Sequence, residues 1–151
     1  MNPYQIRSKS ADETMAFASR LAKQLQPGDV ITLEGNLGAG KTTFTKGLAK
    51  GLNIKRTVNS PTFTIIKEYE GVYPLYHIDA YRLEDHEEDL GFDEYFEGDG
   101  ITVVEWAKFI KEELPEEYIN IQIRYTEDDG RVIELNPIGE RFEKLCRELV
   151  E

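Results

Sequence analysis

The sequence predicts an α/β fold, with a mostly parallel central sheet flanked by helices and antiparallel hairpins appended to it. A β-branched, mostly apolar run at residues 29–34 leads through a glycine-rich loop directly into a helical pattern. A second short apolar run lies at residues 101–105. Such runs are typical of strands that are covered on both faces, as in parallel sheets. Two further pairs of extended runs, each joined by a tight turn signal, predict the hairpins.

The first 51 residues predict a helix, a strand and a second helix, in that order. Ser10 precedes two acidic residues that mark a helix start, so we expect a helix over about residues 11–25, ended by a Pro-Gly pair. The run at 29–34 is the predicted strand. The helix after the glycine-rich loop covers about residues 41–51.

Four extended, β-rich runs in the remaining sequence form the two predicted hairpins. They comprise residues 62–69 with 72–79, and residues 119–125 with 131–135. The turn signals that join them are Glu70-Gly71 and Asp129-Gly130.

Two further segments complete the prediction. The acidic stretch at residues 84–96 predicts a loop or a helix, and the strand at 101–105 follows it. The end of the chain is predicted to be helical, because apolar residues recur there on one helix face. That face is formed by Phe142, Leu145, Cys146 and Leu149. Cys146 is therefore predicted to be a small core residue rather than a reactive thiol.

Length and composition limit the class of protein. With 151 residues and 40% hydrophobic content, residues 1–151 fit one domain. The net charge of -11 argues against a protein that coats nucleic acid or binds anionic membranes. A single cysteine and an N-terminus without the apolar core of a signal peptide lead us to expect a cytoplasmic protein. No apolar run approaches the ~18 residues that span a bilayer.

Residues 35–42, GNLGAGKT, match the phosphate-binding loop pattern GxxxxGK[ST] at every fixed position. The motif follows a predicted strand and opens a predicted helix, so backbone N–H groups and the positive helix end converge on a phosphate. Lys41 can then reach the β- and γ-phosphates of a nucleotide, and the Thr42 hydroxyl can ligate Mg²⁺. The predicted fold is therefore P-loop NTPase-like.

Hydrolysis also requires an acid near the metal and a group that orients water, and two residues compete for these roles. Glu105 ends the strand at 101–105, the position of a Walker B carboxylate beside the phosphate loop. Because Glu is one methylene longer than the usual Asp, it can hold the metal through a water or act on the attacking water. Asp79 ends the preceding extended run and is the other candidate. His77 shares a strand face with Asp79, and we expect it to be packed or hydrogen-bonded rather than a metal ligand.

The tripeptide Ser60-Pro61-Thr62 lies where a GTPase carries the switch segment whose threonine senses the γ-phosphate. Pro61 stiffens the turn and aims Thr62. The same tripeptide is common in ordinary loops, so both interpretations stay open. Residues 35–67 contain Lys and Arg but no Asp or Glu, and residues 83–107 show the reverse. The first of these segments is suited to an anionic ligand.

Four segments together resemble the TsaE family, the ATPase component of bacterial tRNA threonylcarbamoyladenosine biosynthesis. They are GNLGAGKTT at 35–43, SPTF at 60–63, HIDAYRL at 77–83 and VVEW at 103–106. The resemblance extends over nearly the full chain. HIDAYRL with the Glu-Trp pair is far more specific than the phosphate loop alone.

The resemblance implies an ATP and Mg²⁺ site with defined residues. ATP contacts are implied for Asn36, Leu37, Gly38, Ala39, Gly40, Lys41, Thr42 and Thr43. Catalytic roles are implied for Glu105, Asp79, Lys41 and Thr62, and metal contacts for Thr42 and Glu105. Base contacts are implied for the region of Ser10-Ala11 and for Arg131.

The resemblance also implies partners. In the family a TsaB–TsaD pair modifies tRNAs that read codons starting with A, and ATP turnover by TsaE supports repeated cycles. We therefore expect an ATPase that is slow without these proteins and that does not bind nucleic acid strongly by itself. The alternatives are a small-molecule kinase, a nucleotide-dependent switch protein and an idle nucleotide-binding subunit. The Asn-Lys-x-Asp guanine signature is absent from the sequence, so adenine is the expected base.

Overall fold

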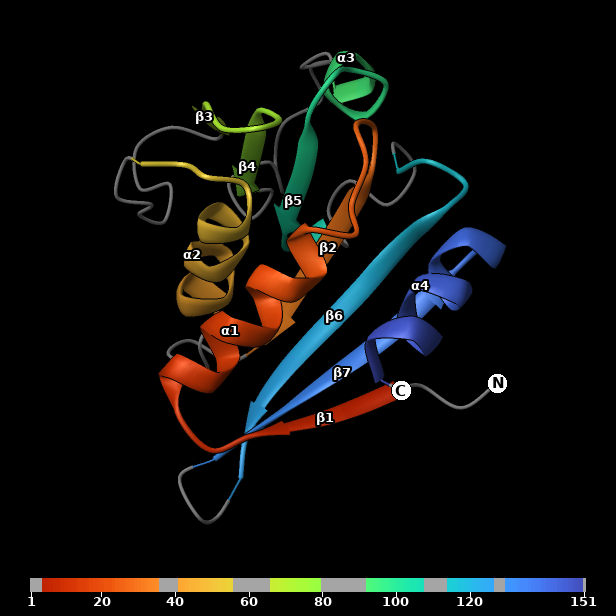
Figure 1. Cartoon of the computed structure of the whole chain (residues 1–151). Helices are drawn as coiled ribbons and strands as arrows, with labels where there is room; N and C mark the ends of the chain where they lie inside the picture. Colours follow the sequence, from red (N-terminus) through yellow and green to blue (C-terminus); the bar gives the residue numbers. More distant parts are fainter. Residues whose placement is uncertain are drawn as a thin grey trace.

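The computed structural model describes residues 4–35, 41–55, 66–79, 92–107, 114–126 and 130–150 (Figure 1). The strands are β1 (Tyr4–Ser8), β2 (Val30–Gly35), β3 (Ile66–Tyr69), β4 (Leu75–Asp79), β5 (Ile101–Glu105), β6 (Tyr118–Tyr125) and β7 (Arg131–Ile138). The helices are α1 (Ala11–Ala22), α2 (Lys41–Gly51), α3 (Phe92–Phe96) and α4 (Glu140–Val150). In these ranges no helix is long and apolar enough to cross a membrane.

The strands of the described ranges form one sheet of seven, in the order β1-β7-β6-β2-β5-β4-β3. The four central strands, β6, β2, β5 and β4, run parallel to one another. At one side β7 pairs antiparallel with β6 and with β1, and at the other β3 pairs antiparallel with β4. The predicted α/β fold, with a parallel core and appended antiparallel hairpins, is confirmed.

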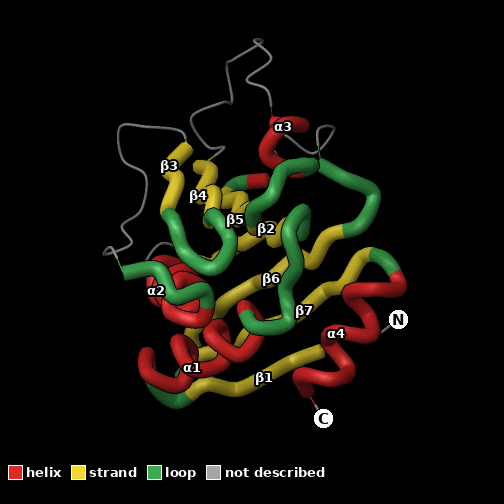
Figure 2. Tube along the Cα trace, turned by 45° about the horizontal axis from the view of Figure 1, so that its top comes forward, coloured by secondary structure: helices red, strands yellow, loops and turns green. Residues whose placement is uncertain are grey.

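Helices α1, α2 and α4 cover one face of this sheet (Figure 2). The largest core cluster joins inward-facing residues of these helices to alternate residues of the strands, among them Phe17, Phe44, Leu145, Ile31, Ile121 and Ile133. A smaller cluster on the other face contains Val30, Ile78, Phe96, Val104 and Ala107. Burying alternate residues of one strand on opposite faces is the behaviour expected of a covered central strand.

Helix α1 begins where the sequence predicts and ends earlier. The Ser10 side chain caps it, because its Oγ accepts a hydrogen bond from the Glu13 N–H at 3.2 Å. The helix ends at Ala22 instead of residue 25. Leu25 lies in the following turn and is still buried, so its side chain extends the apolar stripe beyond the helix.

Two glycines let α2 pack closely against α1. A Cβ atom on Gly47 would lie 2.6 Å from the Met15 carbonyl oxygen, and one on Gly51 would lie 2.5 Å from the Ser19 carbonyl oxygen. Because these neighbours are backbone atoms, a larger residue requires the helices to separate. The close contact fixes α2, and with it Lys41 at its first residue.

Other differences from the sequence prediction concern element ends. β1 was not predicted; its short run gains strand structure by pairing with β7. β7 continues to Ile138 and includes Pro137. Pro137 lies beyond the residues of β7 that pair with β1, so that side of the strand is an edge, where proline is tolerated. The second strand of the first hairpin, Leu75–Asp79, is shorter than the predicted 72–79, and Ile66–Tyr69 is the described part of the first strand. Residues 62–65 and 84–91 lie outside the described residues.

The C-terminal helix agrees with its prediction. Phe142, Leu145, Cys146 and Leu149 are its buried residues. Burial, with a smaller contribution from the nearby Glu143 charge, raises the pKa of the Cys146 thiol to about 12. Cys146 is therefore an unreactive core residue, as predicted.

Candidate nucleotide site

The strand–loop–helix unit of the phosphate-binding motif is framed by two described elements. β2 ends at Gly35, and α2 begins at Lys41 with no acidic residue in its first turn. The positive end of the α2 dipole is therefore not neutralised by an acidic side chain of its own first turn. Thr42 and Thr43 follow Lys41 in this turn and are half-buried. Asn36, Leu37, Gly38, Ala39 and Gly40 lie outside the described residues.

Glu105 lies where the sequence places it, at the carboxyl end of β5 next to β2. Leu33 and Glu105 are register partners on these parallel strands. Lys41 Nζ lies 3.5 Å from Glu105 Oε1, and both side chains are nearly buried. The structure thus brings the motif lysine and the predicted Walker B carboxylate together.

Asp79, the competing acid, ends the strand on the other side of β5. Asp79 and Glu105 are register partners across β4 and β5, so both acids lie at the carboxyl edge of the sheet. Asp79 is half-buried. The two candidates are neighbours, and they do not exclude each other.

The structure adds His77, whose pairing the sequence did not reveal. Its Nε2 lies 2.6 Å from Glu105 Oε2, and its side chain is completely buried. The expectation that His77 is hydrogen-bonded is confirmed, but its partner was missed. The available signal was the alternation of side chains along a strand: His77 lies two residues before Asp79, the register partner of Glu105, so His77 and Glu105 point to one face of the sheet. Using it requires knowing that β4 and β5 are neighbours.

These contacts set the charge state of Glu105. Burial alone would raise its pKa, but the hydrogen bond and charge of His77, together with Lys41, outweigh burial and hold the pKa of Glu105 below its ordinary value. Glu105 is thus a carboxylate at neutral pH, able to hold a metal ion or accept a hydrogen bond from water.

Trp106 completes this side of the site. Its ring centroid lies 5.0 Å from Lys41 Nζ, within cation–π range. Its φ of 60° is in the left-handed region, which is rare for a bulky residue. A strained conformation next to a candidate site is consistent with a functional constraint on the ring's direction.

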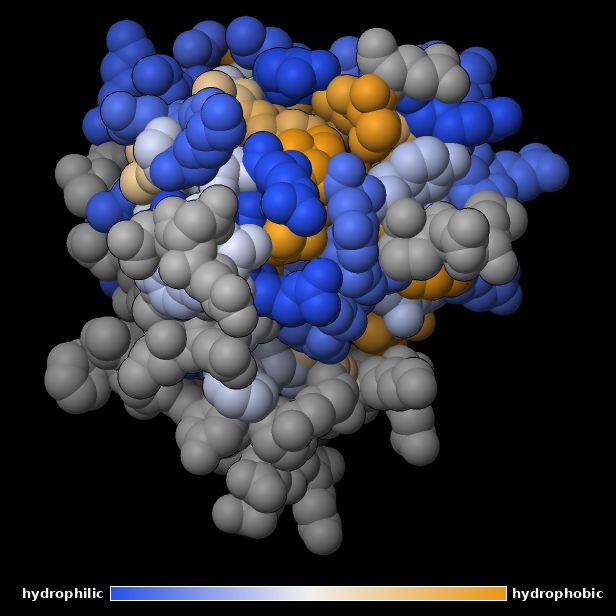
Figure 3. Space-filling model, turned by 90° about the horizontal axis from the view of Figure 1, so that it is seen from below, coloured by the Kyte–Doolittle hydropathy of each residue, from blue (hydrophilic) through white to orange (hydrophobic). Residues whose placement is uncertain are grey.

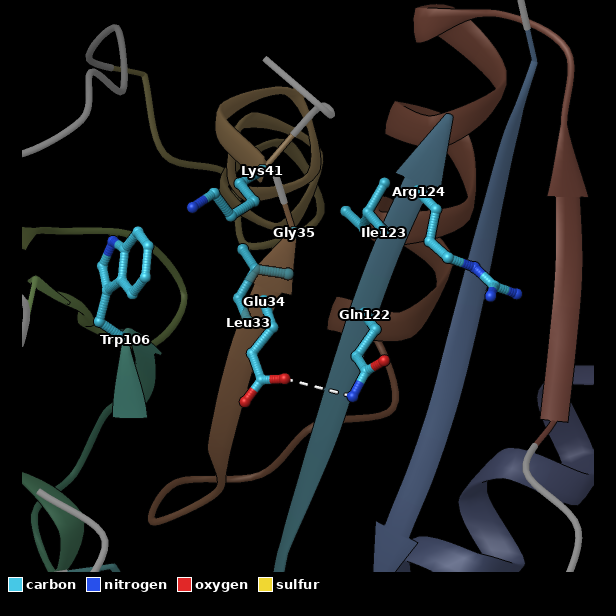
Figure 4. A pocket seen from close by; sticks show the side chains of 8 residues that line it. All are labelled: Leu33, Glu34, Gly35, Lys41, Trp106, Gln122, Ile123 and Arg124. Carbon is cyan, nitrogen blue, oxygen red and sulfur yellow. Dashed lines mark hydrogen bonds between the residues drawn. The ribbon is translucent and has the colours of Figure 1, made fainter. Parts of the chain in front are cut away.

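A pocket of about 410 Å³ opens beside Lys41 (Figure 4). Trp106 and Lys41 lie along one side of it, and Glu34 and Gln122 along the other. Gln122 Nε2 donates a hydrogen bond of 3.2 Å to Glu34 Oε2. A cavity of this size can enclose most of a small ligand.

The two implied base-contact regions lie close to each other at the same edge of the sheet. Ala11 is exposed at the start of α1, just after the cap Ser10. Arg131 begins β7 and pairs in register with Ser8 and with Tyr125. Its guanidinium Cζ lies 5.2 Å from the Tyr125 ring centroid. β1 therefore joins the N-terminal segment to the late hairpin; their contacts to a base stay a prediction.

The carboxyl edge also carries exposed aromatic surface. Figure 3 shows this end from below; its coloured atoms are mainly hydrophilic, with smaller hydrophobic areas. Among the described residues the exposed large apolar side chains are Val72, Trp106, Tyr125 and Val150. Two of them lie at this edge: Trp106 directly follows β5, and Tyr125 is the last residue of β6. Exposed aromatics near a charged site are suited to contact with a ligand or a partner.

No cluster of three or more His, Cys, Asp or Glu side chains suited to a metal occurs in the described ranges. Mg²⁺ at nucleotide sites usually has one or two protein ligands, the others being waters and phosphate oxygens. Glu105 and Thr42 fit that smaller donor set. Thr62 lies outside the described residues, so its switch role stays a prediction.

Comparison with known proteins decides the family. The family model described as "Threonylcarbamoyl adenosine biosynthesis protein TsaE" matches residues 8–133. The chain belongs to the TsaE family. This TsaE chain is 57% identical over 150 residues to the tRNA threonylcarbamoyladenosine biosynthesis protein TsaE of Bacillus subtilis, with 99% of this chain and 95% of the relative covered. The TsaE protein of Treponema pallidum is 42% identical, with 83% and 95% covered.

A solved structure supports the fold of this TsaE chain. The crystal structure of Bacillus subtilis YdiB superposes with a TM-score of 0.85 at 50% sequence identity, covering 98% of this chain and 94% of that one. The resemblance recognised from four short segments is thereby confirmed over nearly the whole chain. Family membership places the chain in tRNA threonylcarbamoyladenosine biosynthesis.

Proposed function

We propose that this chain binds ATP with Mg²⁺ and hydrolyses it in support of a TsaB–TsaD complex that modifies tRNA. The observation that carries the proposal is the 3.5 Å pair between Lys41 Nζ and Glu105 Oε1. A lysine at the start of the phosphate-loop helix and an acid at the end of the neighbouring parallel strand are the two side chains such catalysis requires.

The residues fit ATP and Mg²⁺ in charge as well as in position. The α2 N-terminus and Lys41 supply positive charge for the phosphates, and the pocket beside them supplies space. Thr42 and Glu105 are the residues that would hold Mg²⁺. When bound, Mg²⁺ neutralises charge on the phosphate oxygens.

The chain's own residues have distinct tasks in this proposal. When ATP binds, Lys41 leaves its ion pair with Glu105 and contacts phosphate oxygens instead. Glu105 Oε1 is then free to contact the metal or the attacking water. Asp79 is the second acid at the same edge and supports this step. Trp106 shields Lys41 on one side, which strengthens its electrostatic interaction with phosphate.

A partner is proposed because the described site supplies little positive charge for the developing γ-phosphate. Among the described residues, Lys41 is the lysine or arginine paired with Glu105, and Arg124, which also lines the pocket, lies 3.9 Å from Glu134 instead. Arginine fingers supplied in trans accelerate phosphoryl transfer by ~10³ to 10⁵. The candidates Arg56 and Arg82 lie outside the described residues. A group delivered by docking, or a loop ordered by it, completes the site.

The proposal is tested by following the γ-phosphate of labelled ATP. We expect inorganic phosphate as the product, with ATP preferred over GTP in competition. Transfer of the label to a small acceptor would instead support the kinase alternative. Tight binding without any release, with or without TsaB–TsaD, would support the switch alternative.

A further inference from the structure

The Glu105 carboxylate has its two oxygens bound to different parts of the structure. Oε2 lies 2.6 Å from His77 Nε2, inside the core, and Oε1 lies 3.5 Å from Lys41 Nζ, at the phosphate-binding helix. His77 itself is completely buried within β4 and is not among the residues that line the pocket beside Lys41. The histidine therefore contacts the carboxylate oxygen that Lys41 does not contact.

The hydrogen bond has a defined direction. An ionised carboxylate only accepts hydrogen bonds, so His77 Nε2 carries a hydrogen and donates a hydrogen bond to Glu105 Oε2. The other ring nitrogen, Nδ1, is buried and has no hydrogen-bond partner in the described part of the chain. A buried polar atom without a partner opposes folding. The imidazole thus contributes one short bond to Glu105 and leaves its second nitrogen uncompensated.

A glutamate at this position needs such a contact. Its side chain has several rotatable bonds, and a carboxylate that must reorient during the reaction loses the advantage of preorganisation. The described contacts that fix Glu105 are the hydrogen bond from His77 and the ion pair with Lys41. ATP phosphates compete for Lys41, so only the first of these contacts persists through the proposed reaction.

We propose that His77 is a positioning residue, which fixes Glu105 through Oε2 so that Oε1 faces the metal and the attacking water. The inference rests on the proposed function and deepens it. His77 touches neither the nucleotide nor the metal, so its loss lowers kcat and leaves the KM for ATP nearly unchanged.

Two substitutions separate positioning from packing. His77→Gln places an amide donor at a similar reach, whereas His77→Leu removes the donor. The matched control is Thr102→Val, which removes another completely buried polar atom that has no hydrogen-bond partner among the described residues, on the strand that ends at Glu105. Removing a partner of this kind behind a metal-linked group typically costs about 10- to 100-fold in activity.

With the protein partners present, we expect the kcat of His77→Leu to fall by about 10- to 100-fold. The kcat of His77→Gln should be close to that of wild type, and the kcat of Thr102→Val should equal it. Equal kcat for His77→Leu and wild type overturns the inference. So does a His77→Gln variant as impaired as His77→Leu, because only packing of the ring would then matter.

A second readout does not depend on turnover. The chain contains two histidines, so His86→Asn assigns the ring resonances of His77 by NMR. We expect a slowly exchanging Nε2 proton on His77 that is lost in Glu105→Ala and retained when Mg²⁺ and a non-hydrolysable ATP analogue are added. A ring proton that exchanges freely, or that ignores Glu105→Ala, overturns the inference. Absence of ATP hydrolysis by wild type with its partners overturns the proposed function instead.

Discussion

Lys41 Nζ lies 3.5 Å from Glu105 Oε1 and 5.0 Å from the Trp106 ring centroid. The motif lysine therefore has an anionic and an aromatic partner within its own chain. Phosphate groups must compete with both. In the proposed function this relationship links nucleotide binding to the acid proposed for hydrolysis, since the lysine that would leave Glu105 is the lysine that would hold the phosphates.

Lys41→Ala is expected to abolish ATP binding. The substitution removes the cation expected to offset phosphate charge, and the first turn of α2 contains no other basic side chain. Isothermal titration with ATP and Mg²⁺ measures the effect. Lys46→Ala, an exposed residue of the same helix, is the control that should bind normally. Unchanged affinity in Lys41→Ala would remove the phosphate-loop assignment.

Glu105→Ala is expected to bind ATP and to lose most of its turnover. A metal-linked carboxylate acts mainly in the transition state, and its removal also frees Lys41 from an internal competitor. Parallel titration and phosphate-release measurements separate the two effects. The exposed Glu68→Ala is the matched control. Turnover at the wild-type rate in Glu105→Ala would show that another acid, with Asp79 the first candidate, does this work.

ATP is expected to change the fluorescence of Trp106. It is the single tryptophan of the chain, so the signal has one source. Phosphates that draw Lys41 away from the indole ring alter the electrostatic surroundings of that ring. The emission is titrated with ATP and Mg²⁺ in wild type and in Lys41→Ala. An equal response in both proteins would contradict the link between Lys41 and Trp106.

Gly47→Ala is expected to destabilise the fold, although alanine favours helix by about 1 kcal/mol over glycine. The added Cβ meets the Met15 carbonyl oxygen at 2.6 Å and the Ala18 Cβ at 2.7 Å. Overpacking against backbone costs typically about 1–3 kcal/mol, and we expect it to win. Urea unfolding measures the free energy. A stabilised Gly47→Ala would show that α1 and α2 separate readily.

Local patterns account for what the sequence revealed. The strand–loop–helix unit, the hairpins and the position of Glu105 at a strand end each follow from a run of adjacent residues. The end of α1 was misplaced because Leu25 is buried from a turn and prolongs the helical stripe. β1 was missed because its short run is a strand only through pairing with β7.

Neighbours across the sheet depend on strand order, which no local pattern specifies. The contact between His77 and Glu105 exists because β4 and β5 are adjacent and parallel, although 28 residues separate the two side chains in sequence. The same order makes Asp79 a neighbour of Glu105. The sequence marked both acids as competitors, and the structure shows that they lie together at one edge.

The most direct test of the central proposal compares ATP turnover by the chain alone, with tRNA alone, and with a TsaB–TsaD pair. We predict slow phosphate release in the first two cases and a marked increase with the protein pair, because the described site is short of positive charge for the γ-phosphate. The increase should vanish in Lys41→Ala. Full-speed turnover by the isolated chain, or stimulation by tRNA without the proteins, would contradict partner-dependent hydrolysis.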